Sequence, residues 1–240
     1  MRISNLAICA VALACGCATS PPFRVAVDSL ASLAAQEHRT YVLLPGNEGV
    51  TWDDLQFQEY AQYVKRALHA QGFRLAENAE DANVAIVLSY GIGDPKTHQY
   101  TYSLPVWGQT GVSSAHTYGT ATAYGSMATY SGTTTYTPTY GVTGYTSHVG
   151  SVTTYFRYAR ITGYDFEAFR ESNKQLELWR TTISSSGTSG DLRQVFPVLI
   201  SAAIPYFATN TGKQVQVQLY ESDDAVKTIR GELPNEQHKP

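Results

Sequence analysis

The sequence predicts an α+β or α/β domain in which about two helices pack on one face of a mixed β-sheet. Strand-like and helix-like segments alternate along the chain, and a stretch of different composition at 91–151 interrupts them. With 240 residues, the chain is long enough to form one hydrophobic core without disulfides. We therefore expect a single domain over 24–221, interrupted by a β-rich or disordered insert at 91–151, and a polar C-terminal tail over 222–240.

The first half of the domain has the pattern strand, helix, strand. Thr40–Leu44 is rich in strand-forming residues and is followed by a Pro-Gly turn signal. A helix over about 52–70 follows, because Thr51–Asp54 has the form of a capping box. Its apolar residues share one helical face: Phe57, Tyr60, Val64, Ala67 and Leu68. The continuous apolar run Val84–Leu88 predicts a strand that is buried on both faces.

The second half is expected to begin with strands. Val152–Phe166 is dense in β-branched and aromatic residues and predicts one long strand or a bent pair. Leu176–Ser184 predicts the next strand, and 163–174 is then the turn between the two.

A second helix and a closing strand complete the predicted domain. Apolar residues recur at helical spacing from Asp191 onward, and Pro197 within this pattern predicts a kink or a new helix start. Gln214–Leu219 alternates polar and apolar residues, which predicts a strand with one wet face. The polar chain from Glu221 onward is expected to fray.

The N-terminus has the features of a secretory signal. Arg2 precedes the apolar run Leu6–Ala14, and small residues follow it. The run is too short to span a bilayer, which requires about 20 apolar residues. All three cysteines of the chain lie in this region, so they cannot link parts of the folded domain. We expect a lipoprotein signal peptide over 1–16.

Ala14–Cys17 resembles the lipobox of bacterial lipoproteins, in which a small residue precedes a cysteine that is acylated and becomes the mature N-terminus. The resemblance implies lipidation of Cys17, with Cys15 as the alternative, and a lipidated linker over 17–23. We prefer Cys17, because cleavage before Cys15 would leave a second, free thiol in an oxidising compartment. The acyl chains would anchor the protein to the bilayer. By similarity to sorted lipoproteins, Ala18 in place of Asp implies the outer membrane, with the domain facing the periplasm.

Four segments outside the insert carry a further pattern. They are an extended strand ending in Leu-Pro, a helix end and strand in "AQGFRLAENAEDANVAIVLSYG", a strand in "LWRTTISSSG" and a helix in "DLRQVFPVLISAA". Together they resemble the bacterial lipoprotein family called domain of unknown function 4136, over 24–90 and 152–220. The matching positions are core and capping residues, so the resemblance implies a fold and no reaction. The tyrosine-rich insert departs from the compact family pattern.

The insert is rich in Gly, Thr, Ser and Tyr, and its only charged residues are Asp94 and Lys96. Its tyrosines include four at a spacing of six residues: Tyr118, Tyr124, Tyr130 and Tyr136. This even spacing places all four on one side if the segment is one extended strand. Glycines at 119, 125 and 132 favour turns between short strands instead, in which case the turn geometry decides the facing.

Three hypotheses for the insert stay open. An exposed β-rich flap could stack its tyrosines on sugar rings or on a partner. A partly disordered, low-complexity loop could pack them on the parent sheet. Alternatively, a segment with little charge and few prolines could pair edge to edge with other copies.

Motifs for catalysis or metal binding are missing from the sequence. The six histidines are scattered without metal-ligand spacing, and the glycines at 91 and 93 lack the rest of a phosphate loop. No Gly-x-Ser-x-Gly elbow occurs. We expect no catalytic residue, no metal and no cofactor beyond the covalent lipid. The net charge of −3, without any Lys/Arg cluster, excludes a nucleic-acid-binding class.

These observations predict a non-enzymatic, membrane-anchored periplasmic lipoprotein with a binding or accessory role in the bacterial cell envelope. Its expected partners are the lipid bilayer, through the acyl anchor, and an envelope protein. The alternative is a glycan- or peptidoglycan-binding module that uses the four evenly spaced tyrosines of the insert.

Overall fold

The computed structural model describes residues 21–232. The predicted signal peptide, Cys15, Cys17 and the last eight residues of the predicted tail lie outside this range. The described residues form two compact units. The first unit contains residues 21–95 and 154–232, and the second unit is Lys96–Thr153.

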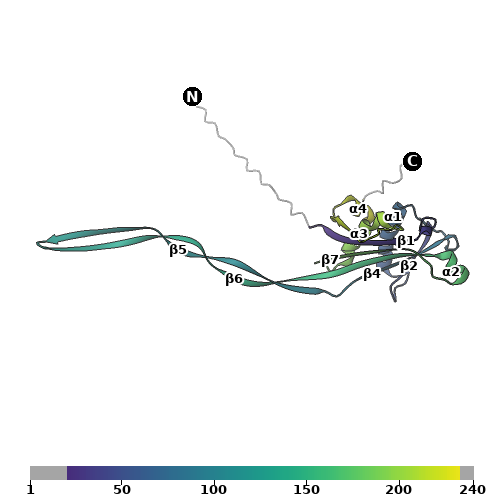
Figure 1. Ribbon diagram of the computed structural model, residues 1–240, viewed down its shortest axis with the longest axis horizontal. Coiled ribbons are helices and arrows are strands. Elements are labelled where there is room, and N and C mark those ends of the chain that lie inside the picture. The colour runs from purple at the N-terminus through teal and green to yellow at the C-terminus, as the bar shows by residue number, and fades with distance from the viewer. Residues whose placement is uncertain (1–20, 233–240) are drawn as a thin grey trace, which may run out of the picture. The chain divides into compact units, whose positions relative to one another are not determined.

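The first unit is built on a mixed β-sheet, as the sequence predicts (Figure 1). Its strands lie in the order β3, β2, β4, β6, β7, β1, β8. Their bounds are β1 Phe23–Ala31, β2 Thr40–Pro45, β3 Arg74–Leu75, β4 Val84–Ile92, β6 Met127–Asp165, β7 Glu177–Gly187 and β8 Val215–Leu219. β2 runs parallel to β3 and β4, whereas the other adjacent pairs on this path are antiparallel. The sheet is therefore parallel at one end and antiparallel through the rest.

Four α-helices occur among the described residues, where the sequence predicts about two. They are α1 Leu55–Ala70, α2 Phe166–Ser172, α3 Leu192–Ala203 and α4 Asp224–Arg230, and short 3₁₀ turns lie at Leu33–Gln36, Ala79–Asp81 and Ile204–Tyr206. Figure 1 shows α1, α3 and α4 together on one side of the strands, with α2 apart from them. The two helices that the sequence did not predict, α2 and α4, are seven residues long, too short for a clear apolar period.

The core lies between the sheet and the three helices on this side. Alternate residues of the strands point into it, such as Val25 and Val27 on β1 and Ile86 and Leu88 on β4. The ring of Tyr60 on α1 stacks on that of Phe196 on α3, with the centroids 4.0 Å apart. The helices are thus joined to each other as well as to the sheet.

Helix α1 begins three residues later than the expected start at 52. The backbone N–H of Asp54 donates to the Thr51 carbonyl at 3.2 Å, so Thr51–Asp54 forms a turn and not the first helical residues. Asp54 is the N-cap, and its carboxylate accepts a hydrogen bond from the Phe57 N–H at 2.8 Å. The cap is therefore Asp54 at the end of the predicted capping box.

Helix α3 begins at Leu192 and continues through Pro197 to Ala203, so the expected new start at Pro197 is wrong. The carboxylate of Asp191 caps the helix by accepting from the N–H groups of Arg193 and Gln194. A proline inside a helix costs about 3 kcal/mol. Ten residues of α3 are buried, and this packing outweighs the lost hydrogen bond.

Two expected irregular segments contain helices. The predicted turn at 163–174 is the end of β6 followed by α2, which the Asp165 carboxylate caps through the Ala168 N–H. The tail predicted to fray forms α4, whose Val226 and Ile229 are buried against the core. These two side chains are the only strongly apolar residues between Glu221 and Glu232, which is why this stretch resembles a free tail in sequence.

We predict that Asp54→Ala destabilises the protein by about 1 kcal/mol, because the Phe57 N–H loses its acceptor. Asp53→Ala is the matched control, since it removes the neighbouring carboxylate, which does not cap the helix. Urea unfolding followed by circular dichroism gives both free energies of unfolding. Equal losses in the two variants would contradict the assignment of Asp54 as the cap.

Candidate functional site

The second unit is a two-stranded hairpin. Strand β5 (Lys96–Tyr124) pairs with β6, and Gly125-Ser126 is the turn that joins them. Only the first turn residue has a positive φ, +63°, which matches a type II′ turn with glycine in the first central position. We call Lys96–Thr153 the hairpin. Of the three glycines that favour turns in the sequence, at 119, 125 and 132, only Gly125 lies in one.

Side-chain contacts give the register of the hairpin. Near the turn, Thr117 is hydrogen-bonded to Thr134 at 2.9 Å and Ser114 to Thr137 at 3.1 Å. In each of these two pairs the residues lie directly opposite each other in the register that a two-residue turn sets. Far from the turn, Thr97 contacts Thr153 at 2.9 Å, one residue away from the partner that this register requires. The pairing therefore shifts by one residue along the hairpin, as at a β-bulge.

The four evenly spaced tyrosines lie on both strands of the hairpin, two on each. Tyr118 and Tyr124 belong to β5, and Tyr130 and Tyr136 belong to β6. In the register near the turn, even-numbered residues of β5 share a face with odd-numbered residues of β6. The two pairs of tyrosines therefore lie on opposite faces. The segment is not one extended strand, the condition under which all four would face one side, because the turn at Gly125-Ser126 divides it and decides the facing.

All four tyrosine rings are accessible to solvent. Their exposed fractions range from 61% for Tyr136 to 92% for Tyr124. Some rings of the hairpin lie over glycine of the neighbouring strand: a Cβ added to Gly119 would lie 2.7 Å from the ring of Tyr130, and one added to Gly150 would lie 2.7 Å from that of Tyr100.

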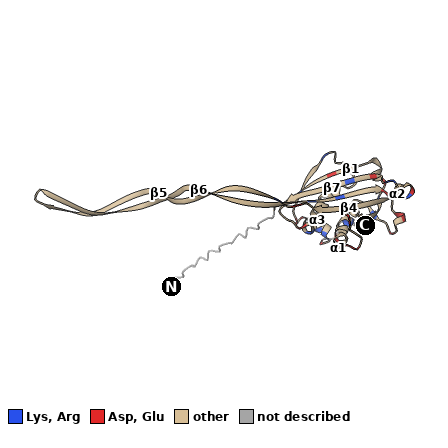
Figure 2. Ribbon diagram, turned by 90° about the horizontal axis from the view of Figure 1, so that it is seen from below, with Lys and Arg blue, Asp and Glu red and all other residues tan. Residues whose placement is uncertain are grey.

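The hairpin is almost without charge. Its only Lys, Arg, Asp or Glu is Lys96, at its start. In Figure 2 the charged residues gather in the first unit, and the ribbons of the hairpin are tan along nearly their whole length. Its exposed side chains include large apolar ones: Leu104, Val106, Trp107, Val112, Met127, Val142 and Val149. A surface of tyrosine, threonine and aliphatic side chains can make stacking contacts, apolar contacts and hydrogen bonds through its hydroxyl groups.

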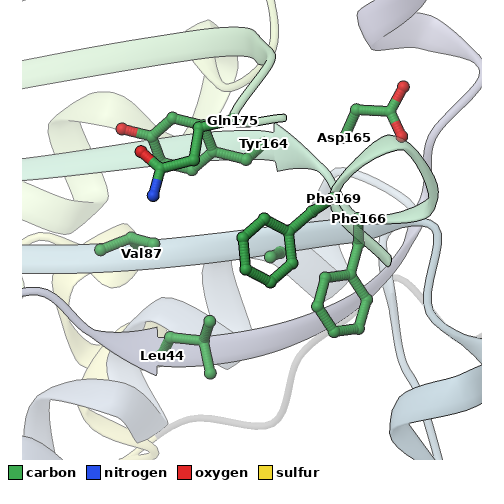
Figure 3. Close-up of a pocket in the computed structure, with 8 residues that line it drawn as sticks. Leu44, Val87, Tyr164, Asp165, Phe166, Phe169 and Gln175 are labelled. Atoms are coloured by element: carbon green, nitrogen blue, oxygen red, sulfur yellow. The ribbon is translucent and has the colours of Figure 1, made fainter. Parts of the chain in front are cut away.

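The first unit has an apolar pocket of about 300 Å³ beneath α2 (Figure 3). Leu44 and Val87 form its floor, and Phe166 and Phe169 of α2 lie over them with parallel rings 6.4 Å apart. Leu44 and Val87 alternate with residues of the core, so the pocket lies on the sheet face opposite α1. The pocket can accept a small apolar group.

Arg170 fixes the position of α2 beside this pocket. Its guanidinium donates to the carbonyls of Glu80 at 2.7 Å and Ala82 at 3.2 Å. It also lies 5.1 Å from the centre of the Phe166 ring. The acidic side chain at the pocket, Asp165, is occupied as the N-cap of α2. The polar groups around the pocket thus hold its wall in place.

Arg157 is a buried cation of the first unit. Its two terminal nitrogens donate to the Ser189 carbonyl at 3.0 Å and the Ser185 hydroxyl at 3.1 Å, and Nε has no partner. Arg157 takes part in none of the ion pairs found within the described part of the chain. Burial lowers the pKa of the Arg157 guanidinium. Arg157 has no recognisable signal in the sequence, because a lone arginine in a strand matches no motif.

Neither predicted lipidation residue, Cys17 or its alternative Cys15, is among the described residues. Over residues 21–232, no cluster of three or more His, Cys, Asp or Glu is arranged to hold a metal ion. Within the same range, no helix is sufficiently long and apolar to cross a membrane.

Comparison of the chain with protein-family models and with curated proteins gave no match. Among solved structures, it is similar to a PDZ domain protein from Parabacteroides distasonis, with a TM-score of 0.36 and 10% identity over 83% of this chain. The chain spans 40% of the length of that protein. A likeness this distant carries no argument about what the chain binds.

We predict that Gly119→Ala destabilises the hairpin, because the new Cβ would lie 2.5 Å from the Ser131 carbonyl oxygen. Overpacking of this kind costs about 1–3 kcal/mol. Gly144→Ala is the matched control, since nothing lies within 4 Å of its Cβ position. Hydrogen exchange measured by mass spectrometry should show lost protection near residue 119 in the first variant alone. Similar protection in both variants would refute the close approach of the strands at Gly119.

Proposed function

We propose that this chain is a non-enzymatic, membrane-anchored periplasmic lipoprotein that binds a partner in the bacterial cell envelope. The hairpin is the observation that supports a binding role most directly. It presents a long surface of aromatic, hydroxyl and aliphatic side chains with a single charged residue. Large exposed apolar patches usually mark interaction sites.

The anchor in this proposal is a lipid on Cys17. Its support is the resemblance of Ala14–Cys17 to a lipobox and the lack of any cysteine after Cys17. Two or three acyl chains would hold the protein on a bilayer, at about 0.8 kcal/mol for each buried CH₂. Ala18 supports sorting to the outer membrane. The resemblance to domain of unknown function 4136 is part of the same proposal, since that family consists of bacterial lipoproteins.

The first unit has two roles in this proposal. β6 contributes to both units, so one strand of the hairpin continues into the folded sheet of the first unit. The pocket beneath α2 offers a second contact for an apolar group of the partner. Both roles are compatible with an accessory subunit.

A second candidate function is glycan binding by the tyrosines. The exposure of Tyr118, Tyr124, Tyr130 and Tyr136 favours it, because flat aromatic rings stack on the apolar faces of sugars. The opposite facing of the two pairs would let the hairpin lie between two glycan strands. Peptidoglycan would be the nearest such polymer for an outer-membrane lipoprotein.

Metabolic labelling with a palmitate analogue tests the anchor. We predict that Cys17→Ser abolishes labelling, because the acylated residue is removed, and that Cys15→Ser, as the matched control, keeps it. The measurement is in-gel detection of the label on the full chain in bacterial cells. Loss of the label in Cys15→Ser alone would move the anchor to Cys15, and persistence in both variants would exclude lipidation at either residue.

Sedimentation with purified peptidoglycan tests the glycan hypothesis. We predict that replacing the four tyrosines with alanine removes binding, whereas replacing them with phenylalanine retains it, because the stacking ring remains. The fraction of protein in the pellet is measured for both variants and the native chain. Unchanged binding by the alanine variant would exclude these tyrosines as the glycan surface.

A further inference from the structure

The hairpin has two open edges. Within the described chain β5 pairs only with β6, and residues 127–153 of β6 have β5 as their only partner strand. Each strand therefore presents along its outer side a row of backbone N–H and C=O groups that pair with no other strand of the described chain. β5 is 29 residues long, so this row extends over about 95 Å at roughly 3.3 Å per residue.

The hairpin also lacks a core of its own. None of its residues is buried, and two strands alone are marginally stable in water. Stability rises when a third strand adds cross-strand neighbours for the exposed side chains. The hairpin consequently gains from a partner that supplies another strand.

The usual protection of a sheet edge is sparse here. Charged side chains and prolines discourage edge pairing, and the hairpin contains only Lys96, Pro105 and Pro138. The two-residue turn makes Tyr124 and Met127 a hydrogen-bonded pair. Residues 127, 129 and the following odd-numbered residues of β6 therefore direct their N–H groups toward β5, and the even-numbered residues direct theirs outward. Pro138 is even-numbered, so it removes one donor from the outer edge of β6.

A second copy of the same chain fits these edges better than other partners do. It supplies a strand of equal length, and since the hairpin is nearly uncharged, two copies do not repel each other. β5 and β6 of one hairpin are antiparallel to each other, so we consider copies whose hairpins lie side by side in the same direction. β5 of one copy is then antiparallel to β6 of the next.

We propose that hairpins of several copies join edge to edge, with β5 of one chain paired with β6 of the next in a continuous intermolecular sheet. The contact uses two different edges, so each copy leaves one edge of either kind free for a further copy. Such head-to-tail contacts form closed rings or open filaments, and they do not stop at a dimer.

Proline at outward-pointing positions tests the proposal without removing hydrogen bonds inside the hairpin. Ala115→Pro with Ala121→Pro blocks the β5 edge, and Ala128→Pro with Val142→Pro blocks the β6 edge. Lysine at the same positions gives a second pair of variants, which blocks pairing through charge without restricting the backbone. Hydrogen exchange checks that each variant keeps its hairpin, and palmitate labelling shows separately that each keeps its anchor.

The mass of the full chain in detergent is measured by light scattering for each protein alone and for an equal mixture. The native chain is expected to form assemblies of three or more copies. Each blocked variant alone should be monomeric, because every contact needs one β5 edge and one β6 edge. The mixture should form dimers, since each variant still has the edge that the other lacks.

Three results would overturn the proposal: a monomeric native chain, oligomers of either blocked variant alone, and monomers in the mixture. Oligomers of the β6-blocked variant would assign the contact to two β5 edges. A monomeric native chain that sediments with peptidoglycan would assign the hairpin to glycan binding. The lipid anchor is unaffected by these results, because palmitate labelling tests it independently.

Discussion

Antiparallel hydrogen bonding of β6 to β4 and β7 is the interaction on which the first unit depends. β6 pairs with β4 along Val84–Ile92 and with β7 along its other side, so it connects the parallel end of the sheet to the antiparallel end. Helix α1 crosses over between the parallel strands β2 and β3, and α3 packs on β7 and β1. β6 thus connects the two parts of the sheet that carry α1 and α3, the helices whose Tyr60 and Phe196 rings stack.

Tyrosine serves two different physical purposes in this chain. In the core, burial raises the pKa of Tyr60 to about 12, and its ring is in edge contact with that of Tyr90 as well as stacked on α3. In the hairpin the ring of Tyr130 is largely in water and rests on the bare backbone of Gly119. The first arrangement stabilises through apolar burial, and the second through pairing between two strands. Amino-acid composition alone does not distinguish these uses.

Sequence periodicity predicts those elements whose apolar residues form one continuous face against the core, whether fully or partly buried. α1, β2, β4 and β8 are of this kind, and their predicted and observed positions agree to within a few residues. β1 was not predicted, because Arg24 and Asp28 on its exposed face interrupt the apolar pattern, although it is paired on both sides. The turn of the hairpin was uncertain because several glycines offered equivalent places for it. Without the position of the turn, the face on which each tyrosine lies could not be derived, since a register shift of one residue moves every side chain of a strand to the other face.

The composition of the hairpin also affects how readily proteases can cleave it. Exposed backbone is normally a preferred site of cleavage. Trypsin-like proteases need a basic side chain for the acidic group in their specificity pocket, and the chain contains no Lys or Arg between Lys96 and Arg157. It contains no Asp or Glu there either, so proteases that select acidic residues find no site. The nearly charge-free surface is therefore also resistant to digestion by both classes of enzyme.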